Sequence, residues 1–171
     1  MELYVERGFE ATTVADIAER AGLTERTFFR HFADKREVLF VGQEDFHEAF
    51  VSKVEAAPSD ASPLEAVAAA VREVAVSWEP RRPWSQERGR VITDNTGLQE
   101  RELIKLARVT EAIAESLRGR GVGEPAASLA AQSGVAVFHV GFTEWIATSN
   151  TRTFASIVDA AFAELKVVVA A

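Results

Sequence analysis

Two arginines, Arg26 and Arg30, have a spacing that would let both side chains contact DNA from one face of a helix. A guanidinium group can pair with O6 and N7 of guanine in the major groove, or it can bind a phosphate. Phe28 and Phe32 fall on the opposite face, where their rings can pack inward. The pattern predicts a short helix with an aromatic inner face and a basic outer face.

A second short helix is predicted immediately before this one. Thr12 and Thr13 are both good N-caps, and Gly22 can end the helix because glycine readily adopts the left-handed conformation. Thr24 then suits the N-cap of the arginine-bearing helix. The apolar residues that follow the helical spacing are Val14, Ile17, Ala18 and Ala21. Two helices joined by a glycine turn form a helix-turn-helix, which binds DNA through its second helix.

The same pattern has a simpler interpretation. Pairs of amphipathic helices with a glycine turn occur in many all-α proteins, and Arg26 and Arg30 could be an ordinary solvated surface. Spacing alone does not separate the two interpretations.

Residues 3–40 resemble the N-terminal domain of TetR-family transcriptional repressors. Residues 8–24 match the pattern G-[FY]-x-x-T-[TS]-[VI]-x-x-I-A-x-x-A-G-[VL]-[ST], which is followed by an aromatic-x-x-Phe and a lysine. This motif is long and specific, whereas the remaining chain resembles the family only in its all-helical layout. By this comparison the chain starts within the family's first helix, which leaves open whether Met1 is the natural start.

The resemblance implies a set of DNA-contacting residues, with phosphate contacts from the helix start at Thr13 and from Lys35. It also implies base and phosphate contacts from a reading helix at about residues 25–32. Two positions depart from the family: Phe29 lacks the tyrosine hydroxyl that often meets a phosphate, and Glu25 is acidic where a basic residue is common. The predicted set is Thr13, Thr24, Glu25, Arg26, Thr27, Phe29, Arg30 and Lys35.

Charge limits how this chain could bind DNA. The 171 residues carry a formal net charge of −7. Residues 1–40 hold six basic and eight acidic side chains, a net charge of −2, whereas residues 24–36 hold four basic and two acidic ones. A positive charge confined to one helix does not coat DNA electrostatically. Binding would therefore need specific geometry and two copies of the chain.

The fold class predicted is all-α, with a helix-turn-helix DNA-binding domain in residues 1–40 and a larger helical ligand-binding and dimerisation domain in residues 41–171. A long helix over residues 35–56 is expected to connect the two, with Gly42 inside it serving close packing. A helix over residues 98–118 is expected to point Leu103 inward, together with Leu106, Ile113 and Leu117.

Small residues mark the penultimate helix, expected over residues 125–148. Gly134 and Gly141 lie seven residues apart and would let a neighbouring helix approach closely. Ordinary packing within the chain explains them equally well. The resemblance implies a homodimer formed by the last two helices, which would read a near-palindromic operator with half-sites about one turn (~34 Å) apart.

Aromatic residues in the larger domain suggest a cavity for a small-molecule inducer, because such sites combine apolar walls with a few polar groups. The alternative is that these rings simply fill a core. The resemblance implies an inducer pocket but not its lining. The predicted ligand-binding residues are Trp78, Trp84, Arg88, Asn95, Phe138, His139, Phe142 and Trp145.

Nothing in the sequence points to an enzyme, a cofactor or a metal. The three histidines are scattered, there are no cysteines, and no HExxH, P-loop, GxSxG or dinucleotide motif occurs. No apolar stretch approaches a membrane span, and no signal peptide is visible, which fits the cytoplasm.

The predicted function is a DNA-binding regulator, a repressor released from its operator by an inducer. The alternatives are a helical DNA-binding dimer without a ligand and a helical module that binds a protein partner. The sequence identifies neither the inducer nor the operator nor the regulated genes, and it does not exclude activation.

Overall fold

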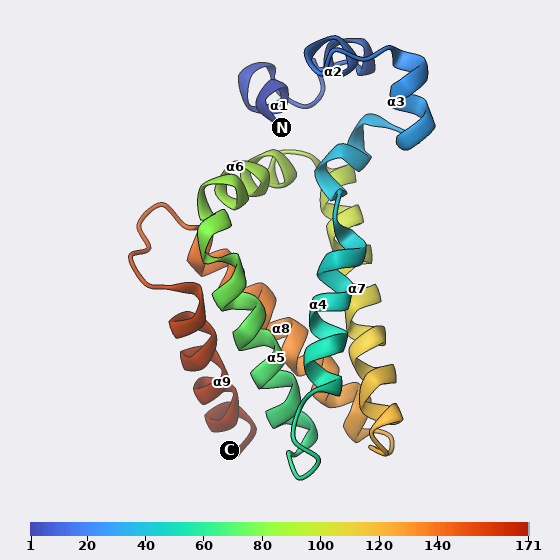
Figure 1. Cartoon of the computed structure of the whole chain (residues 1–171). Coiled ribbons are helices and arrows are strands. Elements are labelled where there is room, and N and C mark those ends of the chain that lie inside the picture. The colour runs from blue at the N-terminus through green and yellow to red at the C-terminus, as the bar shows by residue number, and fades with distance from the viewer. Residues whose placement is uncertain (171) are drawn as a thin grey trace.

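Three short helices sit on one end of a bundle of longer ones (Figure 1). The computed structural model describes residues 1–170, so that Ala171, the last residue of the predicted second domain, lies outside the described residues. The first elements are α1 (Glu2–Arg7), α2 (Val14–Arg20), α3 (Glu25–His31) and the 3₁₀ helix η1 (Lys35–Phe40). The rest are α4 (Gln43–Glu55), α5 (Pro63–Trp78), the 3₁₀ helix η2 (Glu79–Arg81), α6 (Arg82–Thr93), α7 (Thr96–Gly119), α8 (Ala126–Ile146) and α9 (Phe154–Ala170).

The all-α prediction is confirmed, since residues 1–170 contain no strand. None of the helices described is both long enough and apolar enough to cross a membrane.

Local hydrogen bonds set the ends of α2 and α3 as the sequence predicts. The Thr13 hydroxyl accepts from the amide of Asp16 at 3.1 Å, and the Asp16 carboxylate accepts from the amide of Thr13 at 2.8 Å. This reciprocal pair satisfies two amides that the first turn leaves free. Gly22 adopts a left-handed φ of 68° in the turn, and Thr24 caps α3 by accepting from the amide of Thr27. The helix-turn-helix is therefore encoded by neighbouring residues.

The single helix expected over residues 35–56 is wrong. The chain forms η1, turns at Val41 and Gly42, and only then begins α4. Gly42 has a left-handed φ of 82° at the N-cap of α4, so it makes a turn and does not serve helix packing. The break lets Leu39 and Phe40 pack into a small core while Phe46 packs into the large one.

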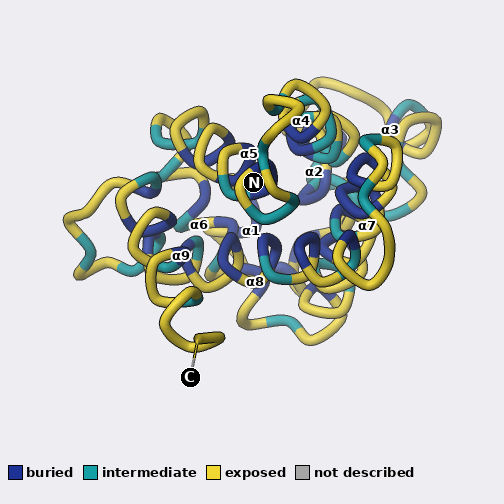
Figure 2. Tube along the Cα trace, turned by 90° about the horizontal axis from the view of Figure 1, so that it is seen from below, coloured by how far each residue is buried: buried dark blue, intermediate teal, exposed yellow. Residues whose placement is uncertain are grey.

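Two hydrophobic clusters result. The large one joins α4, α5, α7, α8 and α9, and Figure 2 shows buried segments of these helices on their inner sides. The small one joins the N-terminal unit to α6 and the start of α7. Its buried members are Tyr4, Phe9, Leu39, Phe40, Val91, Ile92 and Leu98. The helix-turn-helix therefore shares its core with the helical part that carries it.

Leu103 is exposed on α7, so its predicted inward orientation is wrong, although Leu106, Ile113 and Leu117 are buried. The reason is that Glu102 and Lys105 occupy the inner face of this turn, where they form a charged cluster with Arg88. The helical phase then directs Leu103 to the surface.

Both glycines of α8 pack against helices of their own chain. A Cβ added at Gly134 would lie 2.1 Å from Cγ1 of Val67 on α5. A Cβ at Gly141 would meet Phe154, Ile157 and Val158 of α9, each at 3.5 Å. Packing within the chain accounts for the small residues that were also considered for a dimer contact.

Candidate DNA-binding face and ligand cavity

The outer face of α3 presents the two predicted arginines. Arg26 and Arg30 are exposed, Phe29 is 54% exposed, and Phe28 on the inner side is only 3% exposed. The Phe28 ring packs against that of Phe32, with centroids 5.1 Å apart. Inward aromatic packing therefore holds the helix with its arginines outward.

Ion pairs within the N-terminal unit account for three other arginines. Arg7 contacts Asp16 at 3.2 Å, and Arg20 contacts both Glu2 and Glu6. In the same way, Arg36 contacts Asp34 at 2.6 Å. By contrast, Arg26 and Arg30 have no carboxylate partner within residues 1–170. The unneutralised guanidinium charge of this unit is concentrated on α3.

The predicted threonines are engaged locally. The Thr13 hydroxyl donates to Oδ2 of Asp16 at 2.6 Å, and this hydrogen bond lowers the pKa of the Asp16 carboxyl. The hydroxyls of Thr24 and Thr27 lie 3.1 Å apart. Glu25 is exposed in the first turn of α3. Contacts from these residues to DNA stay predictions.

Lys35 has a structural role that was not predicted from the sequence. Its ammonium group donates to the carbonyls of Phe9, Glu10 and Thr12 at 2.8, 3.2 and 3.0 Å. These contacts use all three donors and tie the start of η1 to the loop before α2. A phosphate contact by Lys35 stays a prediction, and it would have to replace one of these carbonyls.

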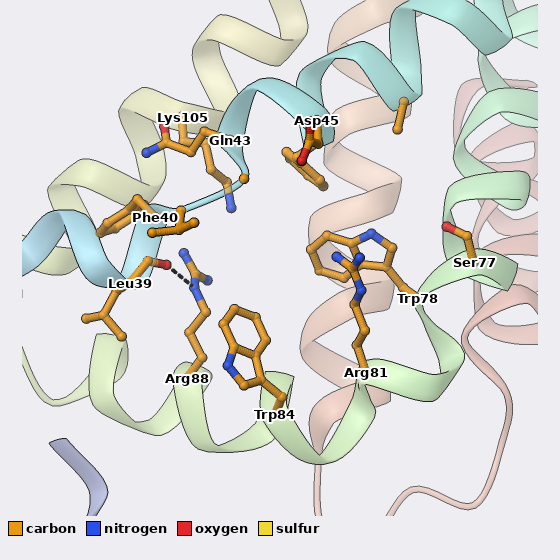
Figure 3. A pocket seen from close by; sticks show the side chains of 14 residues that line it. Leu39, Phe40, Gln43, Asp45, Ser77, Trp78, Arg81, Trp84, Arg88 and Lys105 are labelled. Atoms are coloured by element: carbon orange, nitrogen blue, oxygen red, sulfur yellow. Dashed lines mark hydrogen bonds between the residues drawn. The ribbon is translucent and has the colours of Figure 1, made fainter. Parts of the chain in front are cut away.

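A cavity of about 220 Å³ lies between the end of η1, the first half of α4 and the helices α5, η2, α6 and α7 (Figure 3). Three of the eight predicted ligand-binding residues line it, namely Trp78, Trp84 and Arg88. Arg81 and Lys105 also line it, and the sequence interpretation missed both. Two sequence features could have pointed to these residues. Arg81 directly follows Pro80, and Lys105 lies three residues after Glu102, a spacing that permits an ion pair on one helix face.

The prediction that all eight residues surround one cavity is wrong. Phe138 is buried in the large core with its ring 5.6 Å from that of Phe46, and Phe142 stacks on Phe138 at 6.0 Å. Trp145 is fully buried and stacks on Phe154 at 4.7 Å. These three rings fill the core, as the alternative interpretation proposed.

The other two predicted residues lie elsewhere. His139 is exposed on α8. The Asn95 amide donates to the carbonyl of Val91 at 2.7 Å, which secures the connection between α6 and α7.

Arg88 links the cavity to the N-terminal unit. Its Nε donates to the carbonyl of Leu39 in η1 at 2.8 Å, and its Nη2 donates to Oε2 of Glu102 at 2.6 Å. Lys105 donates to the other oxygen of Glu102 at 2.6 Å. A ligand that displaces Arg88 would therefore act directly on the last turn of η1.

Opposing effects act on the carboxylate at the centre of this cluster. Burial opposes its charge, but Arg88 and Lys105 outweigh burial and lower the pKa of Glu102. Burial lowers the pKa of Lys105, and the nearby Arg88 charge adds to that effect, while Glu102 opposes it.

Within residues 1–170 no group of three or more His, Asp or Glu side chains could hold a metal ion.

Comparisons with known sequences match both parts of the chain. Residues 1–40 match the family described as bacterial regulatory proteins, tetR family, and residues 61–170 match the family described as MftR C-terminal domain. The HTH-type transcriptional regulator TcmR of Streptomyces glaucescens is 43% identical over 74 residues. That match covers 43% of this chain and 33% of TcmR, so it spans about a third of the relative's length.

Solved structures share the fold at low identity. A putative TetR-family transcriptional regulator from Mesorhizobium loti superposes with a TM-score of 0.63 and 20% identity, covering 99% of this chain and 90% of the other. Thermus thermophilus FadR, a TetR-family transcriptional repressor in complex with lauroyl-CoA, superposes with a TM-score of 0.61 and 20% identity. That superposition covers 96% of this chain and 88% of FadR.

Proposed function

The chain belongs to the TetR family of bacterial regulatory proteins, and from this premise we propose that it is a DNA-binding transcriptional regulator. It acts as a homodimeric repressor, and a small-molecule inducer releases it from a near-palindromic operator. The protein works in the cytoplasm, where it meets DNA, and it catalyses no reaction.

The outer face of α3 carries the proposal. Arg26 and Arg30 are exposed there without a carboxylate partner among the described residues, while three neighbouring arginines are neutralised. Caps at Thr13 and Thr24 fix where α2 and α3 begin. The result is a short helix with two guanidinium groups that no carboxylate of the described residues neutralises, which suits contacts to guanine edges and phosphates.

The dimer is proposed to form through α8 and α9. These helices expose large apolar side chains: Leu129 and Val140 on α8, and Val167, Val168 and Val169 on α9. A two-fold axis through this face would place two copies of α3 to read successive major grooves. The apolar residues, and not the glycines, would form the contact.

The inducer is proposed to bind in the cavity beside the turn at Gly42. FadR, which shares the fold, was solved with lauroyl-CoA, so this architecture can hold a small molecule. The Arg88–Leu39 hydrogen bond supplies a route from cavity to helix-turn-helix. Inducer and operator would then weaken each other's binding by the same factor.

Fluorescence anisotropy with the DNA upstream of the protein's own gene tests the proposal. We expect a dimer, by sizing, that prefers this DNA over random duplex of equal length, with an affinity that falls as salt rises. Equal affinity for both duplexes at two salt concentrations would contradict a sequence-reading regulator. A selective dimer that no compound releases would be a DNA-binding protein without an inducer.

A further inference from the structure

We propose that the cavity binds a flat, apolar acid with a single negative charge, and that Arg81 recognises the acid group. The inference rests on the proposed ligand-responsive function and specifies the class of its inducer.

Two tryptophans supply the flat apolar surfaces. Trp78 is held rigidly, with its ring 5.1 Å from that of Phe46 and 5.9 Å from that of Phe142. Trp84 is 42% exposed at the cavity and has no aromatic ring against it among residues 1–170. Figure 3 shows its indole between the side chains of Arg88 and Arg81. The Arg88 guanidinium lies over the Trp84 ring at 5.9 Å, and the rest of this indole is open to the cavity. A rigid indole and a partly exposed one favour a planar ligand that packs against them.

The charges around the cavity favour an anion. Arg81, Arg88 and Lys105 line it with Asp45, and Glu102 lies behind it against two of the cations. Three positive and two negative groups leave one positive charge. A ligand with a single negative charge would neutralise the site, whereas a cation would increase the imbalance.

Arg81 is the cation available for the ligand. Arg88 and Lys105 share the Glu102 carboxylate, and each contacts it at 2.6 Å, so both cations already have a partner in the chain. The Arg81 guanidinium has neither a hydrogen bond nor a salt bridge to any described residue. In Figure 3 it extends from η2 toward the Trp78 ring, on the opposite side of Trp84 from Arg88. A carboxylate at this position could accept two parallel hydrogen bonds from it.

Two probes of the same size separate charge from shape. The acid 2-naphthoate and the neutral amide 2-naphthamide share one planar ring system, and both are small enough for a cavity of about 220 Å³. Calorimetric titration of the full chain, without DNA, should show 2-naphthoate binding about tenfold more tightly, as expected for a charge-assisted hydrogen bond.

Variants then assign the preference to residues. Arg81→Gln should remove the preference by weakening 2-naphthoate about tenfold while leaving 2-naphthamide within about twofold. Arg90→Gln is the matched control, because Arg90 is an exposed arginine of α6 outside the cavity lining. Trp84→Ala should weaken both probes. Circular dichroism checks that each variant keeps its helices.

Equal affinity for the two probes would overturn the acid class, and no binding of either would overturn the flat-ligand class. An Arg81→Gln variant that behaves like Arg90→Gln would overturn the role of Arg81. Because these titrations contain no DNA, they are independent of the regulator assignment. If the chain prefers 2-naphthoate but binds no operator, the acid site is supported and the proposed regulator function is contradicted.

Discussion

Arg20 and Arg30 lie on adjacent helices of the same small unit and meet different surroundings. Arg20 donates to Glu2 and Glu6 at 3.1 and 3.0 Å, so its charge is balanced within the chain. Arg30 has no carboxylate partner in the described part of the chain, and its Nη2 lies 3.4 Å from His31. The same residue type is structural in one position and free for a ligand in the other.

Replacing Arg30 tests its role at the DNA interface. Arg30→Ala should weaken operator binding by about 1–3 kcal/mol, roughly 5- to 150-fold, because a contact to a base edge or phosphate is lost. Anisotropy at fixed salt measures the change. Arg108→Ala removes the same charge from the exposed surface of α7 and should leave affinity nearly unchanged. Equal effects of the two substitutions on operator affinity would mean that Arg30 contributes only through its charge and makes no specific contact.

Glu102 couples stability to pH. Its lowered pKa in the folded protein means that the ionised form stabilises the fold above the ordinary glutamate range, and that this stabilisation is lost as pH falls through the folded pKa. Glu102→Gln should cost about 3 kcal/mol near neutral pH, because Arg88 and Lys105 lose their shared partner.

Urea unfolding of the wild-type protein and of Glu102→Gln, at neutral and acidic pH, measures the contribution of Glu102 to the free energy of unfolding. The difference between wild type and Glu102→Gln should shrink on acidification, since protonated Glu102 then resembles glutamine. Glu100→Gln, at an exposed position of the same helix, should change little. A difference that does not vary with pH would mean that Glu102 is not ionised in the fold.

At the scale of helices, close approach of α5 and α8 depends on one missing side chain. Val67 on α5 fills the space that a Cβ at Gly134 would need. The same helices bury Val71 and Val74 with almost no exposure. This contact is part of the large hydrophobic cluster that packs the helices of the bundle together.

Gly134→Ala should therefore destabilise the protein by about 1–3 kcal/mol through overpacking. Gly97→Ala is the control, because a Cβ there meets nothing within 4 Å and the position lies in the first turn of α7. Thermal unfolding should show a loss of stability for Gly134→Ala and none for Gly97→Ala. Adding Val67→Ala should recover part of the Gly134→Ala loss, and the absence of recovery would place the cost elsewhere.

At the scale of the whole molecule, α9 and α7 lie on opposite sides of the bundle in both Figure 1 and Figure 2. Exposed valines cluster on the α9 side, where Val167, Val168 and Val169 are 64%, 66% and 71% exposed. A second copy docked on this side would leave the cavity and the outer face of α3 to their own ligands. The proposed dimer is compatible with both proposed sites.

Charged substitutions test this arrangement. Val140→Glu combined with Val167→Glu should yield a monomer in light scattering and weaken operator binding at least tenfold, because one helix-turn-helix contacts only one half-site. Leu103→Glu combined with Ile104→Glu adds the same two charges to the exposed α7 surface and should leave the dimer intact. A doubly substituted protein that stays dimeric would move the interface away from α8 and α9.

Much of the helix-turn-helix could be predicted from sequence because its determinants are local. Thr13 and Thr24 cap helices through amides three residues away, and the four-residue spacing of Arg26 and Arg30 places both on one face. The all-α class follows from the same local patterns. Because these contacts form between residues close in sequence, they do not depend on how distant parts of the chain pack.

The cavity was decided only in three dimensions. Arg88 meets Leu39 across 49 residues of sequence, and no local pattern distinguishes Trp84 at the cavity from Trp145 in the core. The turn at Gly42 likewise depends on the need for Leu39 and Phe46 to enter different cores. Helix periodicity says which face is apolar, but packing between distant helices decides which apolar faces fill a core and which enclose a space.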